Sequence, residues 1–150
     1  MQLDIAWYIE TATEVGGDYY DYALADDGTL TLTLGDATGH GMAAGSLIFA
    51  TKSLFRNLSH QADMAETFTA MSRSLKEMNL QRIGMAMNMV KIKDHTMHVS
   101  SAGIPPILLY RAASQTVEKY SSRGCRWAFR PRPSMSSRRS SWRRAIRSYS

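Results

Sequence analysis

The segment 15–45 constrains the fold of this chain more than any other part of the sequence. It reads VGGDYYDYALADDGTLTLTLGDATGHGMAAG, in which the turn signal Asp-Asp-Gly separates two apolar stretches and a glycine-flanked acid lies at each outer end. Apolar stretches joined in this way form a hairpin, which brings Asp18 and Asp36 towards each other. Two close carboxylates repel unless a cation lies between them, so the pair indicates half of a divalent metal site.

The glycines beside these acids permit positive φ and a close approach of the backbone to an ion or a phosphate. A single acid beside glycine is most simply explained as part of a turn. Two glycine-flanked acids on one hairpin favour a shared metal site instead. Gly39, His40 and Gly41 lie where the chain bends into a helix, which suits a phosphate-side role or a plain loop. His40 is a candidate metal ligand, proton donor or loop residue. Asp21 falls on the opposite strand face from Asp18, which favours a structural role.

The rest of the chain predicts strands, then two helices, then strands again. Helices are expected over 42–59 and 63–80, where apolar residues recur three and four apart, the second with Asp63 as its N-cap. Strands are expected over 3–8, 18–24, 30–34, 85–93, 96–101, 107–111 and 116–119. This order predicts an α+β layered structure with a largely antiparallel sheet.

The charge of the chain is divided unevenly between its body and its C-terminal segment. The net charge is +5, yet all 13 acids lie within residues 1–120, and residues 121–150 hold no acid. Those last thirty residues contain nine Arg and nine Ser, with neither helical nor strand periodicity. We expect a domain over 1–118 and a disordered tail over 119–150.

Several classes of function are disfavoured by composition. No apolar run approaches the roughly 20 residues of a membrane span, and no basic region precedes the apolar residues at the N-terminus. The single cysteine, Cys125, excludes an internal disulfide and fits a reducing compartment, so a cytoplasmic location is the default expectation. Nucleic-acid binding through the Arg-rich tail would be salt-sensitive and blind to sequence, and it is the least favoured hypothesis.

Two segments resemble a known family in both order and spacing. The run EVGGDYYDY…LTLGDATGHGMAAGSL resembles the protein phosphatase 2C (PPM-type) superfamily, in its bacterial branch of stage II sporulation protein E and sigma-B-regulator phosphatases. The run HVSSAGIPPILLYR is similar to the Asn-Ala-Gly-His-Pro-Pro segment of that branch, with Ser101 and Ile104 as departures. The resemblance covers roughly residues 1–118. It implies a layered β-sandwich flanked by helices, incomplete here at the C-terminus.

The resemblance also implies an activity and its residues. Asp36 matches the acid that bridges two Mn²⁺ or Mg²⁺ ions, Ala37 offers its backbone carbonyl to one of them, and Asp18 matches the acid at the first metal. A water held between two such ions is a hydroxide-like nucleophile. The implied reaction is hydrolysis of phosphoserine or phosphothreonine on a regulatory protein, of the anti-sigma-factor antagonist type. The two helices match a pair that, in this branch, switches between inactive and active positions.

The implied partners are few. The phosphorylated regulatory protein is the substrate, no cofactor other than the metal ions is expected, and neither a membrane nor a specific nucleic acid is implied. The sequence leaves the oligomeric state open, a homodimer included. The competing functional hypothesis is a catalytically dead module of the same fold that binds a phosphoprotein.

The second half of the family's metal site is absent from this sequence. The branch supplies it from a Ser-Asp-Gly or Thr-Asp-Gly and a later acid, but no Asp or Glu follows Glu118. A one-base shift of the reading frame permits Met-Pro-Leu-Gly within residues 124–128 and Ala-Pro-Gly-Asp-Thr-Leu-Leu-Leu over 143–150, which resemble the family at these places. We interpret residues 119–150 as out-of-frame translation that leaves the chain truncated and inactive. A native Arg/Ser tail is the alternative.

Overall fold

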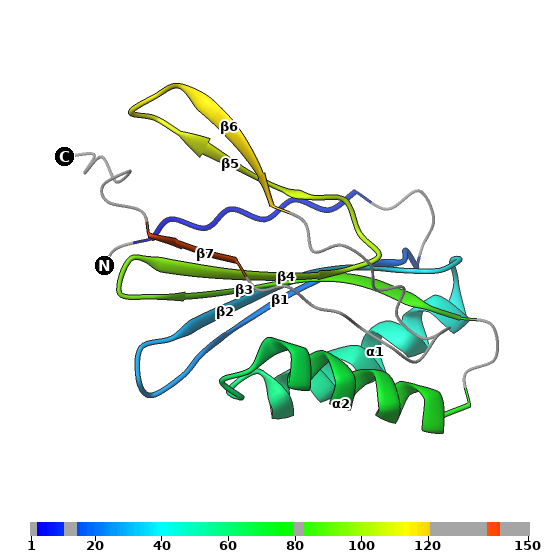
Figure 1. Ribbon diagram of the computed structural model, residues 1–150. Helices are drawn as coiled ribbons and strands as arrows, with labels where there is room; N and C mark the ends of the chain where they lie inside the picture. Colours follow the sequence, from blue (N-terminus) through cyan, green and yellow to red (C-terminus); the bar gives the residue numbers. More distant parts are fainter. Residues whose placement is uncertain (1–2, 11–14, 80–82, 121–137, 142–150) are drawn as a thin grey trace.

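A computed structural model of the chain describes residues 3–10, 15–79, 83–120 and 138–141 (Figure 1). The elements follow in the order β1 (Asp18–Leu24), β2 (Leu30–Ala37), α1 (Met42–Leu58), α2 (Met64–Glu77), β3 (Met85–Lys93), β4 (Thr96–Ala102), β5 (Ile107–Arg111), β6 (Thr116–Tyr120) and β7 (Arg138–Ser141). This α+β order confirms the fold class expected from the sequence.

The structure is layered, with a five-stranded sheet in the middle. Its strand order is β1-β2-β3-β4-β7, and every neighbouring pair is antiparallel. The helices α1 and α2 lie on one face of this sheet, and the β5–β6 hairpin, a separate two-stranded sheet, lies on the other (Figure 1). This arrangement is the helix-flanked sandwich that the resemblance implies.

Two hydrophobic cores hold the layers together, because successive side chains of a strand point to opposite faces. On the helix side, Met85, Met87 and Met89 of β3 are buried in one cluster with Phe55 of α1 and Phe68 of α2. The other face of the sheet forms a second cluster, which joins Ile92, Met97 and Val99 to partly buried residues that include Leu3, Ile107, Leu109 and Tyr120.

The two helices begin differently. Asp63 caps α2 as expected: its carboxylate accepts hydrogen bonds from the amides of Ala65 and Glu66, at 2.6 and 3.3 Å. By contrast, the N-cap residue of α1 is Gly41, which has a φ of 76° and provides no side-chain cap. The start of α1 is therefore fixed by the backbone around it.

One predicted strand is wrong. Residues 3–8 belong to no strand in the structure. Leu3 packs at the margin of the second core, and Trp7 stacks on Tyr20 of β1 with 4.5 Å between ring centroids. The apolar side chains of this segment are thus partly buried by contacts with the face of the sheet. They reach these contacts although the backbone of the segment pairs with no strand.

The expected tail also differs in part. β6 continues to Tyr120, two residues beyond the domain boundary expected at residue 118. Arg138–Ser141 pair with β4 as β7. The expectation of a wholly disordered segment is therefore wrong for these four residues. A ladder is made by backbone groups, so an open sheet edge can pair with a segment of almost any composition. The remaining residues after Tyr120 lie outside the described part, and their out-of-frame origin stays a prediction.

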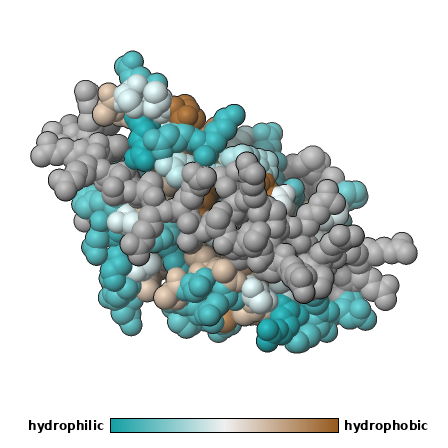
Figure 2. Space-filling view, in the orientation of Figure 1, coloured by the Kyte–Doolittle hydropathy of each residue, from teal (hydrophilic) through white to brown (hydrophobic). Residues whose placement is uncertain are grey.

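The layer opposite the helices leaves apolar side chains exposed. On the outer face of the β5–β6 hairpin these are Leu108, Tyr110 and Val117, and Figure 2 shows apolar surface near this hairpin at the top of the view. On the β1–β2 hairpin, Tyr22, Leu24 and Leu34 are also exposed. No helix in the described part of the chain is long and apolar enough to cross a membrane.

Candidate metal centre

The β1–β2 hairpin places the two predicted acids opposite each other. Its register pairs Asp18 with Asp36 at the open end of the hairpin, and both residues are exposed. Tyr19 and Asp21 are buried on the helix side, so by alternation Asp18 and Asp36 point to the face opposite α1. Directly opposed residues have Cβ atoms about 4.5–5.5 Å apart, which is close enough for two carboxylates to share a cation.

Backbone oxygens converge beside these acids around Gly17. The Gly17 carbonyl accepts a 2.8 Å hydrogen bond from the Ala37 amide. A Cβ atom at Gly17 would lie 2.6 Å from the Ala37 carbonyl oxygen, 3.1 Å from that of Gly39 and 3.2 Å from Asp36 Oδ1. The space that glycine leaves free is thus bounded by carbonyl and carboxylate oxygens. These are the hard ligands that Mg²⁺ and Mn²⁺ prefer, so the residues present fit such an ion.

The loop from Asp36 into α1 is fastened on both sides. The Thr38 amide and hydroxyl both donate to the Gly84 carbonyl, at 2.8 and 3.1 Å. The Gly41 amide donates to the Val15 carbonyl at 3.0 Å. Gly39 and Gly41 have φ values of 88° and 76°, which only glycine adopts without strain. These contacts set the position of the loop relative to the segment that carries Asp18.

The candidate ligands among the described residues would make half of a metal site. They contain no group of three or more His, Cys, Asp and Glu side chains that could hold a metal ion. Asp18, Asp36 and the Ala37 carbonyl supply three oxygens, whereas Mg²⁺ requires octahedral coordination and completes it with waters. His40 is exposed on the loop. The phosphate-side role expected for Gly39, His40 and Gly41 stays a prediction.

Asp21 is buried on the other face of β1, as the sequence indicated. Its carboxylate accepts hydrogen bonds from Lys52 Nζ at 2.9 Å, Arg56 Nη2 at 2.7 Å, the Tyr22 amide at 2.8 Å and the Tyr19 hydroxyl at 3.3 Å. Burial alone would raise the pKa of Asp21, but the hydrogen bonds and the two cations hold that pKa below its ordinary value. Burial, together with the neighbouring Asp21 carboxylate, raises the pKa of Tyr19.

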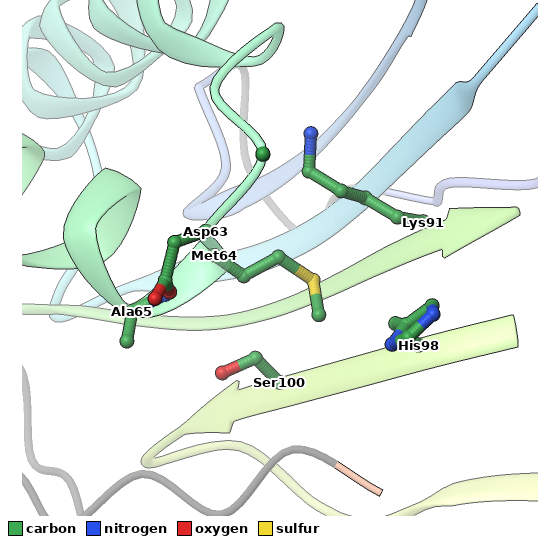
Figure 3. Close-up of a pocket in the computed structure, with 7 residues that line it drawn as sticks. Asp63, Met64, Ala65, Lys91, His98 and Ser100 are labelled. Atoms are coloured by element: carbon green, nitrogen blue, oxygen red, sulfur yellow. The ribbon is translucent and has the colours of Figure 1, made fainter. Parts of the chain in front are cut away.

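A separate hollow lies between the start of α2 and strands β3 and β4 (Figure 3). Its volume is about 420 Å³, and its lining consists of Ala62, Asp63, Met64, Ala65, Lys91, His98 and Ser100. In Figure 3 the Lys91 ammonium group points away from His98 and Ser100. The lining contains neither Asp18 nor Asp36, so this hollow is distinct from the candidate metal centre.

Comparison with solved structures identifies the class of the fold, which is that of the PP2C-type phosphatases. The RsbU and RsbW domains of a Mycobacterium tuberculosis protein match with a TM-score of 0.70 and 23% identity over 86% of this chain. RsbX in complex with magnesium matches with a TM-score of 0.71 and 17% identity over 88%. The PP2C phosphatase domain of the cell fate determinant SpoIIE from Bacillus subtilis, solved with a fragment of its regulatory domain, matches at 0.66 and 14% over 87%.

The family follows from the sequence itself. Residues 26–141 match the model of the stage II sporulation protein E (SpoIIE) family, and the chain belongs to that family. This confirms the resemblance drawn from the glycine-flanked acids. The chain spans 37%, 63% and 38% of the three solved chains, in the order given above. A search of curated protein sequences found no significant match.

Replacing Gly17 by alanine should damage the candidate metal centre specifically. The new methyl group would lie 2.6 Å from the Ala37 carbonyl oxygen, so that carbonyl must move. Overpacking of this kind costs about 1–3 kcal/mol, which chemical denaturation measures. Gly28→Ala is the matched control, because its φ of 79° makes it strained by about 1 kcal/mol while its Cβ meets nothing within 4 Å. We expect weaker Mn²⁺ binding for Gly17→Ala only, and equal Mn²⁺ affinities in the two variants would contradict this role.

Proposed function

We propose that this chain carries the first metal half-site of a protein serine/threonine phosphatase that depends on Mn²⁺ or Mg²⁺. The observation that supports it most directly is the register of Asp18 opposite Asp36, with the Ala37 carbonyl held beside them over the side-chain-free Gly17. Membership of the SpoIIE family and the PP2C-type fold support the same reading. The substrate class that follows is phosphoserine or phosphothreonine on a regulatory protein.

Each residue of the half-site has a definite task in this proposal. A divalent cation held there would act as a Lewis acid toward the phosphoryl oxygens and would lower the pKa of a bound water. Asp36 and Asp18 provide the negative charge that retains the cation, and the Ala37 carbonyl fixes its position relative to the strands. Gly39 and Gly41 hold positive-φ conformations and leave open space beside the backbone, which would suit the approach of a phosphate group.

The same proposal predicts that residues 1–150 on their own are catalytically inactive. No acid follows Glu118, and the described residues provide no third acidic ligand near Asp18 and Asp36. Without carboxylates for a second ion, these residues would hold one cation at most and would lack the chemistry that a second one would supply. The regulatory type of the substrate and the cytoplasmic location belong to this proposal as well.

A second candidate function is a phosphoprotein-binding module without catalysis. It is favoured by one observation, the absence of a group of three metal-ligating side chains among the described residues. It differs from the first proposal in needing no metal at Asp18 and Asp36. Metal binding therefore separates the two.

The experiment is a Mn²⁺ titration of the 150-residue chain, followed by the electron paramagnetic resonance signal of the free ion. We expect one weak site for each chain, and Asp36→Asn should weaken it by at least about tenfold, because it removes a charged ligand. Asp27→Asn is the matched control, since Asp27 lies at the turn of the same hairpin and pairs with Lys93 at 2.5 Å on the surface. An unchanged Mn²⁺ affinity in Asp36→Asn would contradict the half-site assignment and favour the phosphoprotein-binding module.

A further inference from the structure

Asp21 is an ion-pairing carboxylate placed beneath α1. It is 4% exposed, which is rare for an aspartate unless it is paired. Its partners Lys52 and Arg56 come from successive turns of α1, and the side chains of both cations remain about half exposed, at 51% and 52%. The acid is thus fixed in the sheet, and the two cations reach down to it from the helix.

A second polar contact fastens the C-terminal end of α1 to the sheet. The carbonyl of Ser59, the C-cap of α1, accepts hydrogen bonds from Lys91 Nζ at 2.6 Å and from the Thr31 hydroxyl at 3.3 Å. Lys91 and Thr31 are both buried. The orientation of the Lys91 ammonium in Figure 3, away from His98 and Ser100, agrees with this use. Helix α1 is therefore held by polar groups of β1, β2 and β3 as well as by apolar packing.

The N-terminal end of α1 follows directly after the loop that connects it to Asp36 at the end of β2. Asp36 is the penultimate residue of β2, and α1 begins at Met42. A displacement of α1 over the sheet would therefore pull on residues 37–41. Asp21 lies on the same strand as Asp18, so the contact that holds α1 to β1 also relates the loop of Asp36 to Asp18.

We propose that Asp21 is a positioning residue of the metal half-site, which holds α1 against β1 and so keeps Asp36 and Ala37 in place opposite Asp18. Its action passes through α1, and it is not itself a ligand. The part that concerns the metal rests on the function proposed above. The part that concerns α1 and its loop stands on the contacts of Asp21 alone.

The effect of losing the Asp21 charge should be local. Lys52 and Arg56 are half exposed, so they can return to water when their acceptor is removed. The apolar contacts of Ala44, Leu47 and Phe55 remain to keep α1 on the sheet. Asp21→Asn, which keeps the size of the side chain, should therefore loosen α1 and its loop without unfolding the sheet.

Amide hydrogen exchange of the whole chain, resolved by peptide, tests the proposal. In Asp21→Asn we expect exchange over 37–58 to rise by about tenfold or more, since hydrogen bonds to charged groups are among the stronger ones, while β3 and β4 keep their protection. Asp27→Asn, an exposed acid of the same hairpin, should leave both regions unchanged. A uniform rise through β3 and β4, or no rise over 37–58, overturns the positioning role.

Two further variants keep the test decisive. If Asp21→Asn does not fold, Arg56→Gln removes one partner from the half-exposed side and should raise exchange over the same residues to a smaller extent. Asp21→Glu keeps the charge and should restore most of the protection. Exchange as fast in Asp21→Glu as in Asp21→Asn would show that packing at this position, and not its charge, holds α1.

A Mn²⁺ titration separates this proposal from the function on which it rests. Asp21→Asn should weaken Mn²⁺ binding by roughly tenfold, as is usual for outer partners of a metal site. If Asp36→Asn binds Mn²⁺ as well as the unchanged chain does, the proposed function fails while the exchange result still decides the role of Asp21. Local loosening of α1 with unchanged Mn²⁺ affinity overturns the link between Asp21 and the metal.

Discussion

Restoring the proposed reading frame after Glu118 by one base should turn this chain, which we expect to be inactive, into a metal-dependent phosphatase. The expected rise in the rate of phosphate release is at least about a thousandfold, because the restored carboxylates would hold a second cation and so would add its Lewis-acid chemistry. The measurement compares the 150-residue chain and the frame-restored protein on the same phosphoserine protein, with Mn²⁺ present. Both proteins should be assayed at equal concentrations of folded protein.

The control for this experiment is a chelator, which should abolish the activity of the frame-restored protein. Comparable, chelator-sensitive activity in both proteins would show that the second half-site is dispensable, and the mechanism proposed here would be wrong. Resequencing the DNA around the codon of Glu118 tests the frameshift independently of activity.

Asp36→Asn in the frame-restored protein should abolish Mn²⁺-dependent turnover, with a loss of at least about a hundredfold. Asn is nearly the same size as Asp, so the change removes the negative charge that would hold a cation and leaves the hairpin intact. Asp27→Asn, nine residues earlier in the same hairpin, should retain turnover, since an exposed ion pair contributes little. Near-normal turnover in Asp36→Asn would remove that residue from the metal centre.

The pairing of Asp18 with Asp36 could be predicted from the sequence because its geometry is local, and their role as metal ligands stays a proposal. Asp18 and Asp36 lie equally far from the Asp26-Asp27-Gly28 turn, so the turn sets the register that pairs them. The start of α2 could be predicted for the same reason, because its N-cap Asp63 is recognisable from the capping pattern in the neighbouring sequence. The close approach of Gly17 to Ala37 had a visible signal in the paired glycines, although the atoms that it meets were not predictable.

The polar contacts beneath α1 could not be predicted, because they join distant parts of the chain. Asp21 meets Lys52 and Arg56, which are 31 and 35 residues further on and which a helical wheel assigns to the solvent face. Lys91 was expected only as part of an alternating strand, yet it reaches the end of α1. Periodicity shows which face of an element is apolar, but it carries no information on which charge will meet a buried acid.

The abundance of methionine between α1, α2 and the sheet has a consequence for how uniquely the helices are seated. Met64, Met71, Met85, Met87 and Met89 all belong to this core. Methionine is unbranched and adaptable, so such a core fills equally well around several nearby helix placements and distinguishes poorly among them. Apolar burial then determines how strongly α1 adheres to the sheet, and directional bonds must choose its register. Among the described residues, the directional bonds between α1 and the strands include those at Asp21 and at the Ser59 carbonyl.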